Sequence, residues 1–196
     1  MQHFNINRND LLSYLPKECK VAEIGVARGF FSYEILENTK PRELYLIDAW
    51  ENFDIGYPDK NMVSSKRQQK RYKSVVNQFN NYNEVTIIRK RSVDSAQVFD
   101  DCYLDWVYID ADHSYAGCLN DLNAFSNKVK ENGFICGHDW LANGFNREGF
   151  GVNSAVLDFV KSNNYRLSLI TNEDKHASYV IAKNKVSEEN LLNKLV

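Results

Sequence analysis

Short apolar runs alternate with amphipathic segments along most of this chain. The apolar runs are nearly continuous, which is typical of parallel strands covered by helices on both faces. Between the runs, apolar residues recur every three or four positions, as on one face of a helix. The pattern predicts strands at Val21–Gly25, Glu43–Asp48, Val85–Ile88, Asp105–Asp110 and Gly133–Asp139, and helices at Asn9–Leu15, Ser64–Phe79, Tyr115–Val129 and Val152–Val160, with a further helix beginning near Phe30.

The last two predicted strands, Tyr165–Ile170 and Ala177–Ala182, differ from the others because no helix separates them. They are close enough to form a hairpin, so one of them must run antiparallel to the rest of the sheet. Before the fifth strand, Asn132-Gly133 is expected to end a helix in the left-handed conformation. The pattern therefore predicts an α/β fold: a Rossmann-like, seven-stranded, mostly parallel sheet with one antiparallel strand and helices on both faces.

The length of the chain, 196 residues, suits a single domain with a sizeable core. Residues 1–19 are expected to form a leading helix, residues 20–183 the core, and residues 184–196 a C-terminal helix or tail. There is no internal repeat or linker that would divide the chain further.

Charge and the N-terminal sequence bear on partners and compartment. The net charge of −2 gives no reason to expect nucleic acid or an anionic membrane as a partner. No apolar run approaches the roughly 20 residues needed to span a bilayer. The first residues lack the pattern of a signal peptide, and the four cysteines include no C-x-x-C pair. We therefore expect a cytoplasmic protein that acts on a small molecule, with self-association left open.

A glycine loop follows the first predicted strand. It contains Glu23, Gly25 and Gly29, in the pattern E-x-G-x-x-x-G. A dinucleotide pyrophosphate favours glycines at G-x-G-x-x-G spacing, with backbone N–H groups and no carboxylate beside them. A carboxylate next to the loop instead favours a neutral-to-cationic nucleoside. The spacing therefore argues against an NAD(P)-dependent oxidoreductase.

Asp48 ends the second predicted strand, 19 residues after Gly29. A carboxylate at this spacing can accept hydrogen bonds from both hydroxyl groups of a ribose. Trp50 follows closely, and its ring is suited either to covering an adenine or to packing in the core. The sequence leaves both roles of Trp50 open.

Acidic and imidazole side chains gather after the fourth and fifth predicted strands. Asp110, Asp112 and His113 follow the fourth strand, and His138 and Asp139 end the fifth. Burying several such groups together is costly unless a cation or a proton transfer uses them. Because ligands bind at the carboxyl ends of strands in an open α/β sheet, we expect these groups to meet in one cleft. They could hold one divalent cation, or supply a general base such as His113.

Two segments of the sequence resemble a known family. I-D-A-D-H-S-Y at 109–115 and N-G-F-I-C-G-H-D-W at 132–140 are similar to the "methyltransferase domain 24" group of S-adenosylmethionine (SAM)-dependent O-methyltransferases. The resemblance spans about residues 21–160 and implies the class I methyltransferase fold. It also implies that Glu23, Gly25 and Gly29 hold the methionine end of SAM, that Asp48 holds the ribose, and that Ser92 lies near the adenine.

The resemblance implies a reacting centre as well. Asp110, His138 and Asp139 stand where relatives place magnesium ligands, and Asp112 or His113 where some relatives place a general base. Imidazole is a poor ligand for magnesium, so His138 favours manganese or iron.

The prediction from the sequence is therefore a SAM-dependent methyltransferase that methylates a hydroxyl group on a sugar or another small metabolite. Assistance by Mg²⁺ or Mn²⁺ is part of the hypothesis. The predicted catalytic residues are Asp112, His113 and His138; the cofactor-binding residues are Glu23, Gly25, Gly29, Asp48, Trp50, Ser92 and Asp110; the metal ligands are Asp110, His138 and Asp139.

Two alternatives stay open. A nucleic-acid methyltransferase would need a basic surface, but the basic run at 66–73 is expected to be a solvated helix face. A SAM-binding domain without activity, or a partner subunit, has the same sequence signature. The segments expected to set acceptor specificity are the leading helix, residues 51–65 and a glycine-rich lid at 141–151 that includes Phe145 and Phe150.

Overall fold

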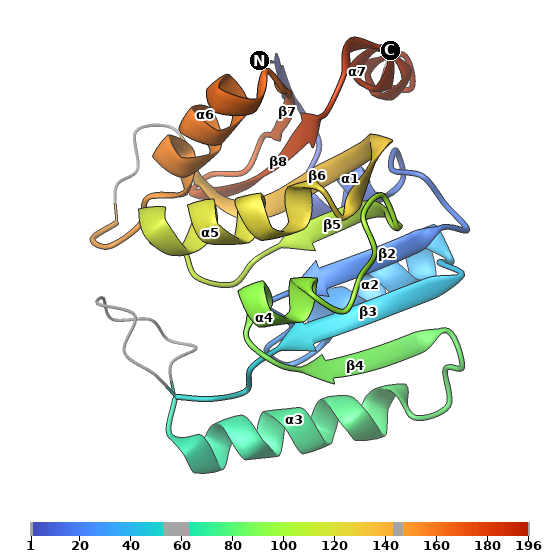
Figure 1. The fold of residues 1–196 in the computed structure, drawn as a ribbon, viewed down its shortest axis with the longest axis vertical. Helices are drawn as coiled ribbons and strands as arrows, with labels where there is room; N and C mark the ends of the chain where they lie inside the picture. Colours follow the sequence, from blue (N-terminus) through green and yellow to red (C-terminus); the bar gives the residue numbers. More distant parts are fainter. Residues whose placement is uncertain (1, 53–62, 143–146, 196) are drawn as a thin grey trace.

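A computed structural model describes residues 2–52, 63–142 and 147–195. Within these ranges an eight-stranded sheet separates two layers of helices (Figure 1). The strand order is β1-β7-β8-β6-β5-β2-β3-β4. The strands are β1 (Gln2–Phe4), β2 (Lys20–Ile24), β3 (Glu43–Asp48), β4 (Val85–Arg89), β5 (Leu104–Ile109), β6 (Val129–Leu141), β7 (Arg166–Thr171) and β8 (His176–Ala182).

The sheet is mostly parallel, as predicted. The strand β8 runs antiparallel to both of its neighbours, β6 and β7, and every other pair is parallel. The prediction of one antiparallel strand near Ala177–Ala182 is therefore confirmed. The sheet has eight strands in place of the seven predicted, because residues 2–4 pair with residues 169–171. Three residues are too few to give a strand signal in the sequence.

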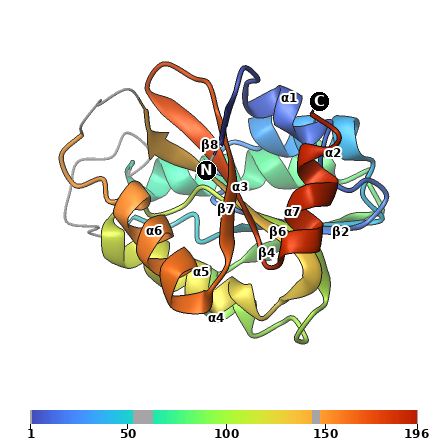
Figure 2. The same ribbon diagram turned by 90° about the horizontal axis from the view of Figure 1, so that it is seen from above.

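The helices form one layer on each face of the sheet, which the view from above makes clear (Figure 2). Apolar residues of α4, α5 and α6 share a core with one face, and those of α1, α2, α3 and α7 share a core with the other. This arrangement explains why the central strands are apolar on both sides. The helices are α1 (Arg8–Leu12), α2 (Phe30–Thr39), α3 (Ser65–Phe79), α4 (Ser92–Ala96), α5 (Tyr115–Ser126), α6 (Val152–Asn163) and α7 (Lys185–Leu192).

The boundary between α5 and β6 differs from the prediction. The helix ends at Ser126 and Val129 already belongs to the strand, so Val129 is buried by the sheet and not by a helical face. Gly133 lies inside β6 and does not have a left-handed conformation. A side chain at this position would collide with the backbone carbonyl of Asp105. Close packing of β6 on its neighbour, and not a helix end, therefore explains this glycine.

The N-terminal segment also differs from the prediction. The first 19 residues hold a strand, β1, as well as a shorter leading helix than expected, α1. Asn7 caps α1 by accepting hydrogen bonds from the backbone N–H groups of Asn9 and Asp10, which starts the helix at Arg8. At the other end, residues 185–192 form a helix, which is one of the two forms predicted for this segment.

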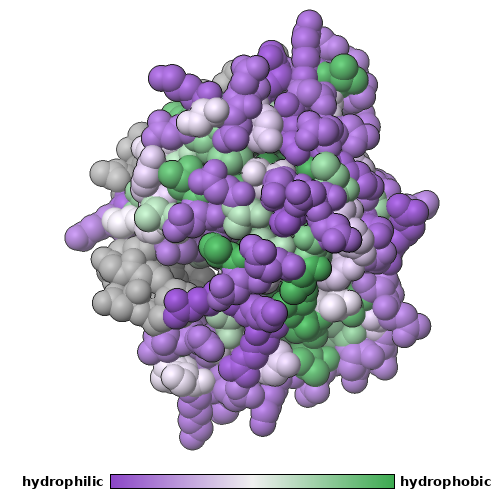
Figure 3. Space-filling view, in the orientation of Figure 1, coloured by the Kyte–Doolittle hydropathy of each residue, from purple (hydrophilic) through white to green (hydrophobic). Residues whose placement is uncertain are grey.

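The surface is largely hydrophilic on the face seen in Figure 3, and hydrophobic side chains show most clearly around α4 and β4. Val93 and Val98, which belong to or follow α4, are among the exposed hydrophobic residues. None of the helices in the described ranges is long and apolar enough to cross a bilayer.

Candidate active site

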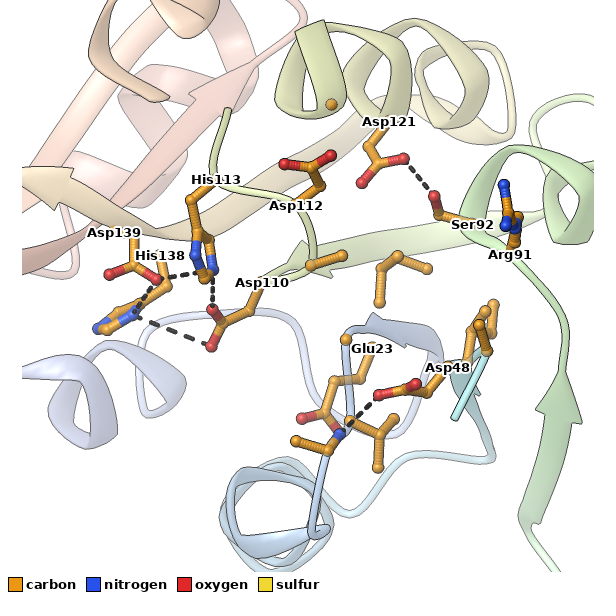
Figure 4. A pocket seen from close by; sticks show the side chains of 18 of the residues that line it. Glu23, Asp48, Arg91, Ser92, Asp110, Asp112, His113, Asp121, His138 and Asp139 are labelled. Carbon is orange, nitrogen blue, oxygen red and sulfur yellow. Dashed lines mark hydrogen bonds and ion pairs between the residues drawn. The ribbon is translucent and has the colours of Figure 1, made fainter. Parts of the chain in front are cut away.

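A cavity of about 1010 Å³ opens at the carboxyl ends of β2, β3, β5 and β6. Two acidic residues line it: Glu23, next to the last residue of β2, and Asp48, the last residue of β3. On the other side of the cavity lie Asp110, His113, His138 and Asp139 (Figure 4). The strand ends expected to meet in one cleft do so in the structure.

The glycine loop forms one wall of this cavity. Gly25, Ala27 and Gly29 have φ angles of 94°, 50° and 77°, so the backbone turns through three left-handed residues in five. A side chain on Gly25 would collide with the backbone carbonyl of Asp110. Glycine is therefore required at position 25 both for the conformation and for the close approach of two strand ends. Gly29 does not itself line the cavity; it caps α2 behind the loop.

Asp48 holds the glycine loop in place. Its carboxylate accepts hydrogen bonds from the backbone N–H groups of Ala27, at 2.8 Å, and of Trp50, at 2.6 Å. Burial raises the pKa of Asp48, and these hydrogen bonds oppose that rise. Each carboxylate oxygen can accept more than one hydrogen bond, so Asp48 still has acceptor capacity toward the cavity.

Trp50 lies behind the cavity wall and does not line it. Its side chain is 1% exposed, its indole N–H donates to the carbonyl of Ala27, and its ring packs against Tyr72. Of the two roles left open by the sequence, packing in the core is the one that the geometry fits.

Glu23 is a buried carboxyl group at the base of the cavity, with a relative exposure of 1%. The hydroxyl of Ser32 donates a hydrogen bond to it. Burial raises the pKa of Glu23 to about 8, despite the opposing effects of that hydrogen bond and of the nearby Arg8. At neutral pH this group is therefore largely protonated, and a cation placed beside it would favour ionisation.

Replacing Glu23 by glutamine should make the stability of the protein less sensitive to pH. Between the ordinary carboxyl pKa of 4.5 and the raised pKa of about 8, folded Glu23 keeps a proton that the unfolded chain has lost. Folding takes up a proton in this window, so the contribution of Glu23 lowers the free energy of unfolding as the pH rises. Glutamine has no proton to take up, and its amide oxygen can still accept the hydrogen bond from Ser32.

We expect the difference in unfolding free energy, variant minus wild type, to grow by up to about 1.4 kcal/mol per pH unit within this window and to level off above it. Urea unfolding of both proteins across the window measures this difference. A difference that stays constant would show that Glu23 has an ordinary pKa.

Ser92 begins α4 at the far side of the cavity, and its hydroxyl donates a hydrogen bond to Asp121 on α5. Asp121 also lines the cavity, and burial raises its pKa to about 7. The second carboxyl oxygen of Asp121 is buried without a hydrogen-bond partner among the described residues. The sequence did not point to Asp121, because an acidic residue on an amphipathic helix usually faces solvent.

His113 lies between two carboxylates. Its Nε2 is 2.9 Å from Asp139 Oδ2 and 3.3 Å from Asp110 Oδ1. Asp139 is also 2.6 Å from Nδ1 of His176. Burial opposes ionisation of Asp139, but the hydrogen bonds from His113 and His138 hold its pKa well below the usual range. The result is a connected cluster of carboxylates and imidazoles with His113 only 7% and Asp139 only 8% exposed.

An irregularity in β6 brings His138 and Asp139 into this cluster. The pairing of β6 with β8 shifts register between Gly137 and Trp140, and Asp139 has a left-handed φ of 59°. Bulges of this kind often redirect side chains beside active sites. Here the bulge turns Asp139 toward His113, whereas in a regular ladder neighbouring side chains would point to opposite faces.

Asp110, His113 and Asp139 could hold a metal ion. Each offers one ligand atom, and these atoms lie within 4.8 Å of one another. This trio differs from the predicted set because His113, and not His138, completes it among the described residues. His138 is at the edge of the cluster, with Nδ1 3.5 Å from Asp139 and 3.9 Å from Asp110. Two carboxylates and an imidazole suit manganese, iron or zinc better than magnesium.

Asp112 has a structural task in addition to any chemical one. It lines the cavity, and its carboxylate accepts a hydrogen bond from the backbone N–H of Ser114, at 2.9 Å, where α5 begins. The side chain also lies against Gly117, where a Cβ would collide with it.

The sequence matches the model of a known protein family. The family model described as "Methyltransferase domain" (Methyltransf_24) matches residues 22–140. The chain belongs to this methyltransferase family. The predicted resemblance is confirmed, and the fold is that of the class I SAM-dependent methyltransferases. No curated protein matches the chain.

Solved structures agree with this assignment at the level of the fold. A SAM-dependent methyltransferase from Aquifex aeolicus is 14% identical, with a TM-score of 0.62 and 90% of each chain covered. The N-methyltransferase NodS from Bradyrhizobium japonicum is 10% identical, with a TM-score of 0.64 over 91% of this chain and 95% of that one. Fibrillarin from Aeropyrum pernix, solved with natively bound SAM, is 10% identical, with a TM-score of 0.62 over 85% and 67% of the two chains.

The cavity of this methyltransferase fits SAM by its own chemistry. SAM carries a sulfonium, an ammonium and a carboxylate, and is therefore cationic overall. Carboxylates outnumber guanidinium groups among the residues that line the cavity. The backbone of the loop forms the wall beside Gly25, and Asp48 offers the acceptors that ribose hydroxyls need.

Two further residues of the methyltransferase site were missing from the prediction. Arg8, from α1, forms an ion pair with Asp110, and His176, from the start of β8, contacts Asp139. Both line the cavity. The local sequence around each residue gives no sign that it belongs to the site, because each reaches the cavity only through pairing of the terminal strands.

Part of the predicted lid, including Phe145, lies outside the described residues, as do residues 53–62 of the other predicted specificity segment. Phe150 and Gly151, at the described end of the predicted lid, lie beside the cluster of carboxylates and imidazoles. The ring of Phe150 is 4.8 Å from His113 and 5.8 Å from His176, and the N–H of Gly151 donates to the carbonyl of His113.

Proposed function

We propose that this methyltransferase transfers the methyl group of SAM to a hydroxyl group on a sugar or another small metabolite. The observation that carries the proposal is the cluster of Asp110, His113 and Asp139 on the cavity wall, of which His113 and Asp139 are buried. Methylation of a hydroxyl group is faster when a general base accepts the proton of that hydroxyl. The imidazole and carboxylates of this cluster could act as such a base.

On the donor side, bound SAM supplies an electrophilic methyl group. Asp48 and the loop around Gly25 orient the nucleoside, and Glu23 faces the cationic end of the donor. Holding donor and acceptor in line contributes much of the rate in such displacements, because it removes the entropic cost of bringing them together.

On the acceptor side, His113 is the proposed base. Asp139 and Asp110 contact Nε2 of its imidazole, so the proton of the acceptor would go to Nδ1, and the two carboxylates would stabilise the positive charge that the ring gains. His176 contacts Asp139 and the ring of Phe150 packs near His113, and these contacts fix the position of Asp139 and His113. His138 and Asp112 are the alternative bases.

A divalent cation is compatible with the same residues. Asp110, His113 and Asp139 would hold it, and it would lower the pKa of the acceptor hydroxyl. In that case His113 would be a ligand and the proton would pass to another group, such as the imidazole of His138. These two versions of the proposal differ in their response to chelation.

Transfer of radioactive methyl from labelled SAM should therefore occur with small hydroxylated acceptors, such as sugars and catechols, and not with nucleic acid. We expect wild-type protein to label at least one hydroxyl acceptor, and mass spectrometry of the product to place the methyl group on oxygen. Addition of EDTA, followed by Mn²⁺ or Mg²⁺, separates the two versions. Labelling of amine acceptors alone would contradict O-methylation, and SAM binding without any labelling would favour a non-catalytic domain.

A further inference from the structure

Arg8 is a cation built into the cavity from outside the region that the family model covers, residues 22–140. It is the first residue of α1, and α1 is tethered on its N-terminal side by the pairing of β1 with β7. Its guanidinium is 2.7 Å from Asp110 Oδ2. Asp110 in turn lies against the glycine loop, because its carbonyl is the atom that a side chain at Gly25 would strike.

Aromatic rings fix the guanidinium in place. Its central carbon is 3.6 Å from the ring centre of Phe31, on α2, and 4.9 Å from that of Tyr108, on β5. An arginine held between a carboxylate and two rings has little rotational freedom left to lose when it binds a ligand. The group is therefore pre-organised.

Hydrogen-bonding capacity remains on this side chain. A guanidinium has five N–H donors in a planar fork. The Nε of Arg8 is buried and has no hydrogen-bond partner among the described residues. The Arg8 side chain as a whole is 21% exposed and lines the cavity, so a ligand there meets the accessible part of the fork.

The methionine end of SAM is a zwitterion, with an ammonium and a carboxylate on the same carbon. Arg8 and Asp110 present the complementary charges, and the carboxyl group of Glu23 lies near them in the same cavity. A carboxylate is the acceptor that best matches a guanidinium fork. We propose that Arg8 binds the α-carboxylate of SAM, and that Asp110 positions Arg8 for this task. The inference rests on SAM binding and is independent of which acceptor is methylated.

The rival role for Arg8 is purely structural, in which it only neutralises Asp110 and packs on Phe31. The two roles differ in how binding depends on the carboxylate of the ligand. S-adenosylhomocysteine carries this group, and its decarboxylated analogue, S-adenosyl-3-thiopropylamine, lacks it. Isothermal titration of both ligands, with wild type and with Arg8→Gln, measures the coupling between Arg8 and the carboxylate without any assay of activity.

We expect Arg8→Gln to weaken binding of S-adenosylhomocysteine by roughly 10- to 100-fold, the range for a charge-assisted hydrogen bond, and to leave binding of the decarboxylated analogue within about threefold. Arg28 is a matched control, since it also lines the cavity but its side chain is exposed. Arg28→Gln should change the affinity for either ligand by less than about threefold.

Equal losses for the two ligands would overturn the proposal and assign Arg8 the structural role. Arg8→Lys covers the case in which the glutamine variant does not fold: it keeps the charge but not the fork, and its loss should again be confined to the ligand with the carboxylate. A wild-type protein that binds both ligands equally would also overturn the proposal. A wild-type protein that binds neither ligand would instead contradict SAM binding itself.

Discussion

Replacing Asp48 by alanine should weaken binding of S-adenosylhomocysteine by about two orders of magnitude. The carboxylate does two things that alanine cannot: it accepts hydrogen bonds from the N–H groups of Ala27 and Trp50, and it offers acceptors to a ribose in the cavity. One hydrogen bond to a charged group is worth about 1.5–3 kcal/mol, or roughly 10- to 150-fold in affinity. Isothermal titration measures the loss directly.

Asp94→Ala is the matched control for this measurement, because Asp94 is an exposed acid that lines the same cavity. It should change affinity by less than about threefold. Asp48→Asn should fall between the two, since an amide oxygen can keep one of the loop hydrogen bonds. If the Asp48→Ala variant binds S-adenosylhomocysteine as tightly as wild type, Asp48 does not bind the donor and only stabilises the loop.

Replacing Asp139 by asparagine should lower turnover by about 10²- to 10⁴-fold, the range that positioned acid–base groups contribute. The two carboxylate oxygens of Asp139 contact His113 and His176. Asparagine has only one acceptor oxygen and no negative charge, so it cannot replace both contacts. Affinity for S-adenosylhomocysteine should stay within about threefold of wild type, because Asp139 belongs to the proposed acceptor side and, among the described residues, makes no contact with Arg8 or the glycine loop that would position the donor. Steady-state kinetics and titration together measure the two effects.

The pH profile and the response to chelation complete this test. If His113 acts as a base, wild-type turnover should rise with pH and be unaffected by EDTA; if a cation is held there, EDTA should abolish turnover. Asp94→Asn should leave turnover unchanged, which controls for loss of a negative charge in the cavity. A turnover of Asp139→Asn within threefold of wild type would place the reaction away from this cluster.

The donor half of the site could be predicted from the sequence because its residues end strands. Glu23 and Asp48 each follow an apolar run that is readable by itself, and parallel strands place their carboxyl ends at one edge. The same rule placed Asp110 and Asp139 near each other. The position of these residues in the site therefore follows from two things: the local sequence, which shows where each strand ends, and the rule for parallel strands.

The acceptor half was predicted less well, because it depends on pairings between distant segments. The choice of His113 over His138 as the member of the trio follows from the bulge in β6, and that bulge arises from pairing with β8. His176 comes from β8 itself. Arg8 depends on β1, a strand of three residues that exists only because β7 is there to pair with it. Such contacts have no signature in local hydrophobic periodicity.

The tethering of both chain ends to the same edge of the sheet bears on how such a protein can change during evolution. The segment that defines the family, residues 22–140, contains neither Arg8 nor His176. These two side chains enter the cavity from flanking segments, α1 and the start of β8. Substitutions at these two positions can therefore alter which ligands the cavity accepts while residues 22–140 stay unchanged. Divergence of substrate range within such a family needs no remodelling of the motif that identifies it.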